Sequence, residues 1–122
     1  MNNDYNINEI DSLNIIVVQG ELVIGRGMGV RNKTARGVIQ ISYFVDMNMR
    51  NRGIGTAIVR HLISLIFRNN DVSLIEAHVD LFNVYSTKVL IKNGFNLKYQ
   101  YAYNKDGLII EALCLSLERQ FY

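Results

Sequence analysis

The sequence predicts a single mixed α/β domain over residues 1–122, built on a twisted sheet with the element order β-β-β-α-β-α-β-β. Three observations lead to this prediction. Short segments at both ends of the chain are β-branched or alternate between apolar and polar residues, which is typical of strands. Two segments with helical spacing follow strand-like segments, and such strand–helix–strand crossovers favour a central parallel pair. No repeat or linker divides the chain, so one core is expected.

The first half of the predicted sheet is an antiparallel meander. The β-branched segment 14–18 is followed by a second strand over residues 22–30, which its glycines weaken. After a polar loop over 31–36, residues 37–47 alternate in the manner of a third strand. Residues 1–13 form a polar N-terminal segment that is expected to lie outside these strands.

Two predicted helices flank a fourth strand. Residues 53–68 are apolar almost all round and should pack closely on the sheet, and His61 beside their polar stripe is interpreted as a surface residue. Residues 72–80 alternate as a strand, and the helix over 83–92 ends at an Asn-Gly pair, where glycine caps it. The last two strands, "FNLKYQYAY" and "LIIEALCLSLERQFY", are joined by the hairpin signal "NKDG". Strand 72–80 should direct Ile75, Ala77 and Val79 to one face and Glu76, His78 and Asp80 to the other.

Composition and charge narrow the function classes. Hydrophobic residues make up 49% of the chain and charged residues 20%, which is ordinary for a globular domain. The net charge of +2 does not indicate that the whole surface binds a polyanion. Basic residues nevertheless gather between residues 25 and 68, where Asp46 is the single acid. A local field of this sign suits a small anionic ligand, and an ordinary solvated face is the alternative.

Cys114 and the N-terminus bear on the compartment. A single cysteine can form neither an internal disulfide nor a metal cluster, so no metal is expected and a reducing, cytoplasmic setting is favoured. Cys114 lies in an apolar stretch and is interpreted as a small core residue. The start "MNNDYNINEIDS" is not that of a signal peptide. The apolar run 57–67 is interrupted by polar residues, so no membrane span is expected.

The stretch "RNRGIGTA" places positive charge and glycines at the start of the first predicted helix. The first N–H groups of a helix lack partners and carry the positive end of its dipole. Gly53 and Gly55 would let a phosphate approach these groups, and Arg50 and Arg52 add charge. The stretch lacks the Lys-Ser/Thr of a P-loop, and Ile58 stands where a dinucleotide fingerprint needs a small residue. An anion site is therefore predicted, with packing of the helix against a strand as the alternative use of the glycines.

A second stretch, "VDLFNVYSTKVLIKNGF", favours one interpretation of this site. Together with "VDMNMRNRGIGTA" it resembles the GNAT superfamily of N-acetyltransferases, from residue 14 to the end of the chain. The family's pyrophosphate signature, Arg/Gln-x-x-Gly-x-Gly/Ala, is matched by Arg50, Gly53 and Gly55, and its usual upstream valine by Val45. The second signature is matched by Asn83, Ser86, Val89, Leu90, Gly94 and Phe95, in the form most similar to enzymes that acetylate the N-termini of ribosomal proteins.

The resemblance implies acetyl-CoA as the co-substrate, bound where strands 37–47 and 72–80 splay apart. The pyrophosphate would lie on the backbone N–H groups of residues 52–56, in agreement with the anion site inferred from the glycines alone. The pantetheine arm would pair with backbone near the end of the third strand, and Lys92 is interpreted as a solvated side chain. The expected cofactor-binding residues are Phe44, Val45, Met47, Arg50, Arg52, Gly53, Ile54, Gly55, Thr56 and Asn83.

Acetyl transfer to an amine benefits from a base that removes a proton. In relatives that acetylate protein N-termini a base often stands at the position of His78, and an imidazole titrates near neutrality, which suits the task. The alternative is a histidine that only packs on the sheet, and Asp80 and Glu76 share its predicted face. Ser86 is the candidate acid for the departing thiolate, or else a small residue that makes room for the coenzyme. The predicted catalytic residues are His78 and Ser86.

The chain departs from the family pattern in several places. Leu90 stands where many relatives have a general-acid tyrosine, and Gln40 where the ribosomal branch often has a glutamate. The family's N-terminal helices, which wall the acceptor pocket, are expected to be absent because residues 1–13 are too few for them. An open acceptor side favours a peptide or protein amine, or a pocket completed by a second subunit in a homodimer. The tyrosine-rich segment 99–103 could contribute to either.

These inferences predict an acetyl-CoA-dependent N-acetyltransferase that acts on an amine, in the first instance of a peptide or protein. The main alternative is a GNAT-like sensor or interaction module that binds acyl-CoA without catalysis, which Leu90 and Gln40 would explain. A nucleic-acid binder that uses the basic stretch is a third hypothesis. It is disfavoured because few aromatic residues lie among the arginines, so no nucleic-acid partner is expected.

Overall fold

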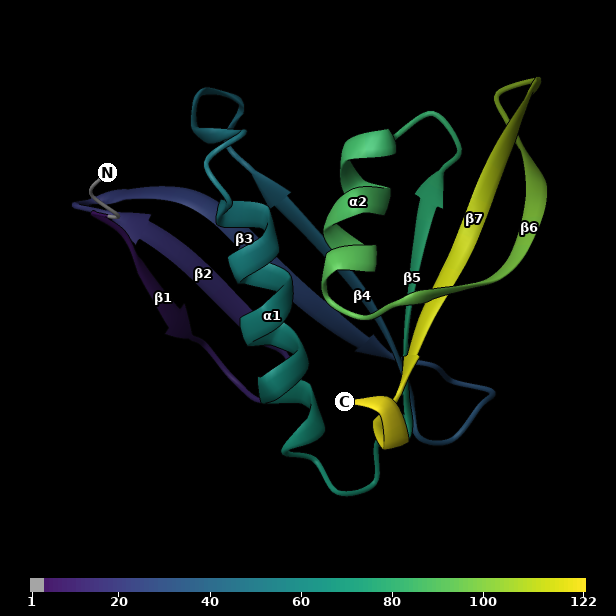
Figure 1. Ribbon diagram of the computed structural model, residues 1–122, viewed down its shortest axis with the longest axis horizontal. Coiled ribbons are helices and arrows are strands. Elements are labelled where there is room, and N and C mark those ends of the chain that lie inside the picture. Colours follow the sequence, from purple (N-terminus) through teal and green to yellow (C-terminus); the bar gives the residue numbers. More distant parts are fainter. Residues whose placement is uncertain (1–3) are drawn as a thin grey trace.

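The computed structural model describes residues 4–122, which form one seven-stranded sheet with two α-helices on the same face (Figure 1). The strand order across the sheet is β1-β2-β3-β4-β5-β7-β6, and only β4 and β5 pair in parallel within this part of the chain. The mixed α/β class and the predicted succession of elements are confirmed, with one strand added at the start. The elements are β1 (Asn6–Glu9), β2 (Asn14–Gln19), β3 (Leu22–Arg31), β4 (Val38–Val45), the 3₁₀ turn η1 (Met47–Met49), α1 (Ile54–Phe67), β5 (Leu74–Asp80), α2 (Val84–Lys92), β6 (Asn96–Lys105), β7 (Leu108–Glu118) and the 3₁₀ turn η2 (Arg119–Phe121).

The additional strand is β1, which lies within the segment expected to precede the sheet. It pairs antiparallel with β2, and Ile7 packs against the core. The Glu9 carboxylate lies 2.8 Å from Nε2 of His61 on α1 and accepts a hydrogen bond of 3.0 Å from Arg68. His61 is therefore half-buried in an ion-pair cluster and not the plain surface residue that was expected. The sequence pattern does not predict β1, because most of its residues are polar and its position depends on contacts with residues far away in the sequence.

Glu9→Gln is expected to lower the melting temperature at neutral pH and to leave it unchanged in acid. The hydrogen bonds from His61 and Arg68 hold the pKa of Glu9 below its ordinary value of 4.5. Such a carboxylate stabilises the fold above its unfolded pKa, and this contribution disappears as the pH falls through the folded pKa. Thermal unfolding from neutral pH to well below 4.5 measures the difference. Glu21→Gln in the β2–β3 turn is the control, and a Glu9→Gln effect that persists in acid would contradict the ion-pair explanation.

Glycines in β3 let α1 approach the sheet closely. A Cβ at Gly25 or at Gly27 would lie 2.9 Å from the Ile58 side chain of α1. The glycines that weaken β3 as a strand therefore provide the space that the apolar helix fills. The largest fully buried side chains of this core include Ile15, Ile39, Ile58, Leu62, Ile66, Ile75 and Leu115.

β4 and β5 pair over only part of their length. The parallel register ends at Ile41 opposite Ala77, and beyond this point the strands separate. β4 continues to Val45 and β5 to Asp80, and α2 lies over the gap between them (Figure 1). The expected splay is therefore present, and it points toward the beginning of both helices.

The β6–β7 hairpin completes the sheet, with β7 inserted between β5 and β6. Its turn has Asp106 and Gly107 at positive φ values of 53° and 86°, as a tight two-residue connection requires. The hairpin predicted from "NKDG" is thus confirmed, whereas the insertion of β7 beside β5 is a tertiary feature. Neither α1 nor α2 of the described chain combines the length and apolar character needed to cross a membrane.

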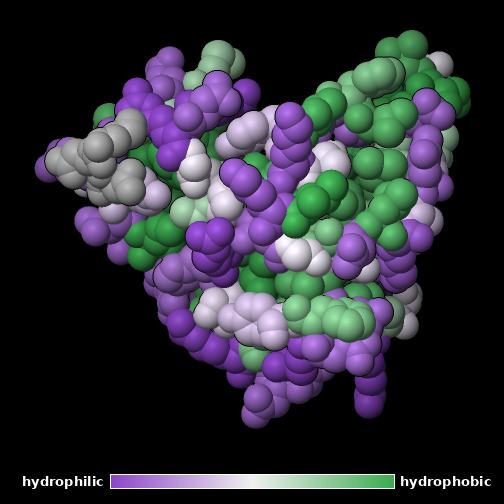
Figure 2. Space-filling view, in the orientation of Figure 1, coloured by the Kyte–Doolittle hydropathy of each residue, from purple (hydrophilic) through white to green (hydrophobic). Residues whose placement is uncertain are grey.

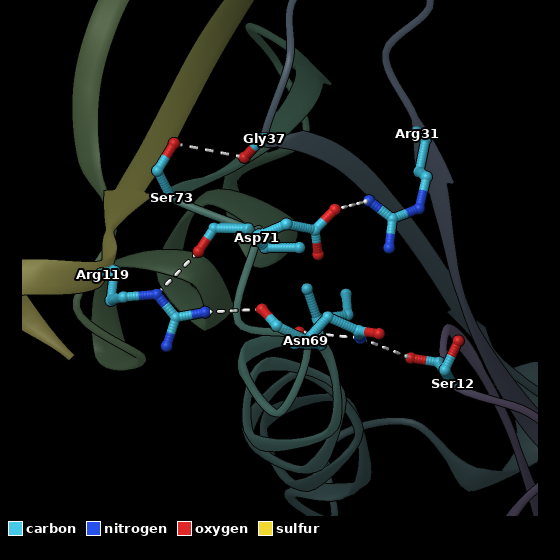
Figure 3. Close-up of polar contacts among 9 residues, drawn as sticks. Ser12, Arg31, Gly37, Asn69, Asp71, Ser73 and Arg119 are labelled. Carbon is cyan, nitrogen blue, oxygen red and sulfur yellow. Dashed lines mark hydrogen bonds and ion pairs between the residues drawn. The ribbon is translucent and has the colours of Figure 1, made fainter.

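The end of the sheet away from the splay is fastened by η2 (Figure 3). Arg119 donates hydrogen bonds of 2.7 Å to the backbone carbonyls of both Asn69 and Val72 in the α1–β5 connection. Arg31 at the end of β3 forms an ion pair of 2.9 Å with Asp71 in the same connection. These contacts tie the end of β3 and the end of the chain to the connection that leads into β5, at the end of the sheet where β4 and β5 are paired.

Candidate functional site

A groove runs from the splay to the space between the two helices. Its inner part, of about 260 Å³, lies between the diverging ends of β4 and β5. The middle part, of about 310 Å³, shares Tyr43, Asn83 and Ser86 with the inner part. The outer part, of about 530 Å³, shares Asn51 and Tyr85 with the middle. These shared lining residues make the three parts one continuous path from the sheet to the start of α1.

The outer part of the groove lies against an uncapped helix start. Gly53 is the N-cap of α1 with a left-handed φ of 78°, which glycine adopts without strain, and no side chain caps the helix. The first N–H groups therefore lack an intrahelical partner, and the positive end of the dipole lies at the groove wall that Gly53 and Thr56 form. Lys88 and Lys92 of α2 also line this part, and none of its described lining residues is acidic. The outer groove is thus suited to an anion.

The surface around the groove is uneven in polarity. Figure 2 shows hydrophilic side chains gathered over the loop that leads into α1, and apolar ones over the tip of the β6–β7 hairpin. At that tip Leu108 and Ile109 are exposed. Hydrophilic side chains thus border the start of α1, where the anion-binding geometry lies.

Most residues expected to bind the coenzyme line the groove. Asn83 borders both the inner and the middle part, and Arg50 donates a hydrogen bond of 3.3 Å from Nε to the Val45 carbonyl, which folds its side chain back along the end of β4. Lys92 is exposed, in keeping with the interpretation as a solvated side chain, and it also lines the outer part. The expected residues found in the lining are Phe44, Val45, Arg50, Gly53, Thr56 and Asn83.

Met47, Arg52, Ile54 and Gly55 are absent from the described lining of the groove. Met47 lies on η1 with 76% of its surface exposed, because β4 is shorter than predicted and ends before it. Ile54 is 2% exposed and belongs to the core. Gly55 is buried, and a Cβ there would lie 2.9 Å from the hydroxyl oxygen of Tyr85. The side chain of Ile54 therefore cannot meet a ligand in the groove, although backbone N–H groups at the helix start can.

A hydrogen bond spans the groove between β4 and α2. The Tyr43 hydroxyl and Oγ of Ser86 are 2.8 Å apart, and burial raises the pKa of Tyr43. Ser86 occupies this place because the Oδ1 atom of Asn83 caps α2 by accepting the Ser86 backbone N–H at 3.2 Å. Sequence analysis missed Tyr43 as a site residue. The alternation of β4 predicts which face its ring occupies, but not that its hydroxyl reaches α2.

His78 lies on β5 beside the inner part of the groove, together with Ser86 and Asp80. Its Nδ1 atom is 2.8 Å from the Tyr101 hydroxyl on β6, and the two rings meet edge to face. Among residues 4–122 no hydrogen-bond partner of Nε2 of His78 is found. When Nδ1 carries the proton and donates it to the tyrosine oxygen, the free Nε2 atom can accept a proton from another molecule.

Glu76, the other acid expected on this face, lies outside the inner groove. It is 8% exposed and accepts a hydrogen bond of 2.6 Å from Lys98, which raises the pKa of that lysine. Cys114 on β7 is buried next to it, on the face away from the helices, and burial raises the pKa of its thiol. Glu76, His78 and Cys114 each place a donor atom within 4.8 Å of the others. The bound Lys98 ammonium and the protonated thiol both oppose a metal ion there.

The two departures from the family pattern differ in their surroundings. Leu90 is fully buried and lines the inner groove, so no hydroxyl is present at the position where many relatives have the acidic tyrosine. Gln40 is exposed on β4 in register with Glu76 and does not belong to the described groove lining. The hydroxyl groups in the described lining of the middle part of the groove belong to Tyr43, Tyr85 and Ser86.

An acetyltransferase (GNAT) domain model matches residues 3–96, so the chain belongs to the GNAT acetyltransferase family. Comparison with curated proteins finds no match. Among solved structures the chain is similar to yncA of Salmonella typhimurium, determined with its cofactor acetyl-CoA, at 17% identity and a TM-score of 0.78 over 86% of this chain and 63% of that one. It is also similar to a ribosomal-protein-alanine N-acetyltransferase of Brucella melitensis, at 20% identity and a TM-score of 0.78 over 86% and 67% of the two chains.

A ribosomal-protein-S5-alanine acetyltransferase of Vibrio fischeri is similar at 19% identity and a TM-score of 0.78, over 89% of this chain and 63% of that one. The chain thus spans less than two thirds of the length of yncA and of the Vibrio fischeri protein. These likenesses confirm the fold that the sequence predicts.

Proposed function

We propose that this protein transfers an acetyl group from acetyl-CoA to a primary amine of a peptide or protein. The observation that carries the proposal is the continuous groove that joins the uncapped start of α1 to the splay beside His78 and Ser86. Family membership supports the class of reaction. The buried, unpaired Cys114 is in keeping with a reducing compartment such as the cytoplasm.

The residues present fit acetyl-CoA along this groove. The outer part offers first-turn N–H groups, Lys88 and Lys92 to phosphates, and the left-handed Gly53 has no atoms within 4 Å of a Cβ position, which leaves the backbone accessible. The middle part offers the apolar Phe44 and Val45 to the pantetheine arm. The inner part would then hold the thioester beside His78.

The chemistry is a balanced acyl transfer. The nitrogen lone pair of the neutral amine forms a bond to the thioester carbonyl carbon as the C–S bond breaks. The products are an amide and coenzyme A. The nitrogen loses one proton and the sulfur gains one, so the reaction balances. His78 would accept the proton through Nε2, and the Tyr43–Ser86 pair would supply one to the thiolate. No metal takes part in this scheme.

The choice of a peptide or protein amine rests on the open face of the sheet. Both helices lie on one face, and no described helix covers the other (Figure 1). A large acceptor can therefore approach the splay from the face that carries His78. The free face also leaves room for a second copy of the chain in a homodimer.

A second candidate function is that of a non-catalytic module that binds acyl-CoA. The apolar, buried Leu90 in the inner groove favours it, because relatives often use a hydroxyl there. Binding of acetyl-CoA without any loss of its acetyl group over a broad panel of amines would support this alternative and reject catalysis.

Acetyl-CoA is expected to bind with a roughly micromolar Kd, about −8 kcal/mol, and NAD much more weakly. The double variant Lys88→Ala/Lys92→Ala should weaken binding of acetyl-CoA about tenfold, because two partly exposed charge pairs with phosphate are lost. Calorimetric titration measures both quantities. If the two lysines contact the 3′-phosphate, the double variant should lose less affinity for 3′-dephospho-CoA than for acetyl-CoA, each relative to the wild-type protein.

Lys105→Ala serves as the matched control, because this lysine lies at the end of β6 and not in the groove lining. A wild-type protein that binds no acetyl-CoA at low ionic strength would overturn the proposed function. It would also leave Gly53 with only a conformational role, at its left-handed φ, and Gly55 with only a packing role against Tyr85.

A further inference from the structure

Two polar pairs cross the sheet on the face away from the helices. The Tyr103 hydroxyl on β6 donates a hydrogen bond of 2.9 Å to Oδ1 of Asp80 on β5, and the Tyr101 hydroxyl lies 2.8 Å from Nδ1 of His78. β6 and β5 are not neighbours, because β7 runs between them. The tyrosines can reach across because the intervening position opposite both Asp80 and Tyr101 is the small Ala112.

Asp80 differs from the other acid on this face in what it contacts. The Glu76 carboxylate is neutralised by Lys98 at 2.6 Å. The Asp80 carboxylate is exposed, and its one hydrogen bond in the described structure comes from the neutral Tyr103 hydroxyl. No cation of residues 4–122 lies within ion-pair distance of it. Its second oxygen, Oδ2, is therefore free to receive a positive charge.

The location of Asp80 connects this charge to the proposed reaction. Asp80 and His78 both line the inner groove and are alternate residues of β5, so their side chains project from the same face of the strand. Apart from His78, no basic residue is found among the described residues of that lining. The inner groove thus offers one carboxylate and one imidazole to a molecule that enters from the open face.

We propose that Asp80, oriented by Tyr103, binds the positively charged amine of the acceptor, and that the site selects amines with no carboxylate beside them. This inference rests on the proposed function and specifies its acceptor as an α-amine next to a neutral amide, as at a peptide N-terminus. The acceptor arrives as an ammonium ion and pairs with Asp80. It loses one proton to Nε2 of His78, which passes it on to water, and then attacks the thioester as the neutral amine. As the C–S bond breaks, the second proton of the nitrogen goes to His78 and the Tyr43–Ser86 pair protonates the thiolate. A free amino acid would bring its own carboxylate against Asp80, and like charges repel.

The test compares alaninamide with alanine as acceptors, since they differ only in the group beside the amine. The wild-type protein should acetylate alaninamide with the higher kcat/KM. Asp80→Asn should lower kcat/KM for alaninamide about fivefold, mainly through KM, because a partly exposed ion pair with the substrate is lost. The preference over alanine should shrink by the same factor. The wild-type KM for alaninamide should rise with ionic strength, and the KM of the variant should not.

Two tyrosine variants distinguish whether Tyr103 orients Asp80 through its hydroxyl or only packs on the sheet. Tyr103→Phe removes the hydrogen bond to Asp80 and should raise KM for alaninamide less than Asp80→Asn does. Tyr99→Phe is the matched control, because its position on β6 pairs with Cys114 and Tyr99 does not line the groove. It should leave KM unchanged. An unchanged KM in Tyr103→Phe would overturn the orienting role of that tyrosine.

The outcomes that overturn the subsite differ from those that overturn the proposed function. A protein that acetylates another peptide amine but not alaninamide, or whose preference is unaltered by Asp80→Asn, contradicts the subsite and leaves the proposed function standing. A protein that binds no acetyl-CoA loses both. Calorimetric titration of each variant with acetyl-CoA keeps the two cases apart, because Asp80 belongs to the inner groove and not to the phosphate end.

Discussion

His78→Ala is expected to lower kcat for acetyl transfer by about 100-fold or more, while acetyl-CoA still binds, because positioned bases contribute factors of this size. His78 lines the inner groove, its Nε2 atom has no hydrogen-bond partner among the described residues, and the Tyr101 hydroxyl lies 2.8 Å from its Nδ1 atom. Steady-state kinetics with a peptide acceptor measure the loss. The pH dependence of kcat/KM that the imidazole imposes should disappear in the variant.

His61→Ala is the control for this experiment, because the other histidine of the chain lies on α1 next to Glu9 and outside the groove lining. It should alter thermal stability and leave kcat unchanged. A His78→Ala protein that folds, binds acetyl-CoA and keeps the wild-type pH–rate profile would show that His78 only packs on the sheet. In that case Asp80 becomes the remaining titratable group of β5 in the inner groove.

Gly25→Ala is expected to lower the free energy of unfolding by about 1–3 kcal/mol, the usual cost of overpacking a core. The new Cβ would lie 2.9 Å from Cδ1 of Ile58 and 3.2 Å from the carbonyl oxygen of Phe44. Ile58→Val removes that Cδ1 atom and by itself should cost about 0.5–1.5 kcal/mol. The double variant should then be more stable than the sum of the two losses predicts, by at least about 0.5 kcal/mol. Urea unfolding of the four proteins measures this coupling.

Gly27→Ala provides the matched control for the coupling. A Cβ there would lie 2.9 Å from Cγ2 of Ile58, a methyl group that valine retains. Ile58→Val should therefore relieve Gly25→Ala but not Gly27→Ala. Equal coupling at Gly25 and Gly27 would mean that the whole of α1 moves away from the sheet. It would contradict a local clash with the Cδ1 methyl group of Ile58.

The outer end of the candidate site, at the uncapped start of α1, could be predicted from sequence because it is local. Gly53, Arg50 and Thr56 stand within one short stretch, and the helix that follows them has a strong apolar pattern. The prediction was less accurate for side chains whose direction depends on packing. Ile54 turns into the core and Met47 leaves the strand on η1, since the helix rotation and the end of β4 are decided by neighbouring elements.

The acceptor end depends on contacts between residues far apart in sequence. Tyr43 meets Ser86, Tyr101 meets His78 and Tyr103 meets Asp80 only because β4, β5, α2 and β6 converge. No spacing in the sequence indicates that β7 lies between β5 and β6, or that its small residues let the tyrosines reach across. The same holds for β1, whose polar residues gave no strand pattern and which Glu9 secures to α1.

The sequence by itself determined the class of fold and the order of most elements, because hydrophobic periodicity, glycine turns and helix caps are properties of neighbouring residues. Its two motifs carried the resemblance to the family. The tertiary structure decided where β4 and β5 separate, which of the polar residues of β5 remain free, and which tyrosines face them. The physical reason is that burial and partner choice are set by long-range packing. Lys98 forms an ion pair with Glu76, and no such partner is found for Asp80 among the described residues, although both acids project from the same face of β5.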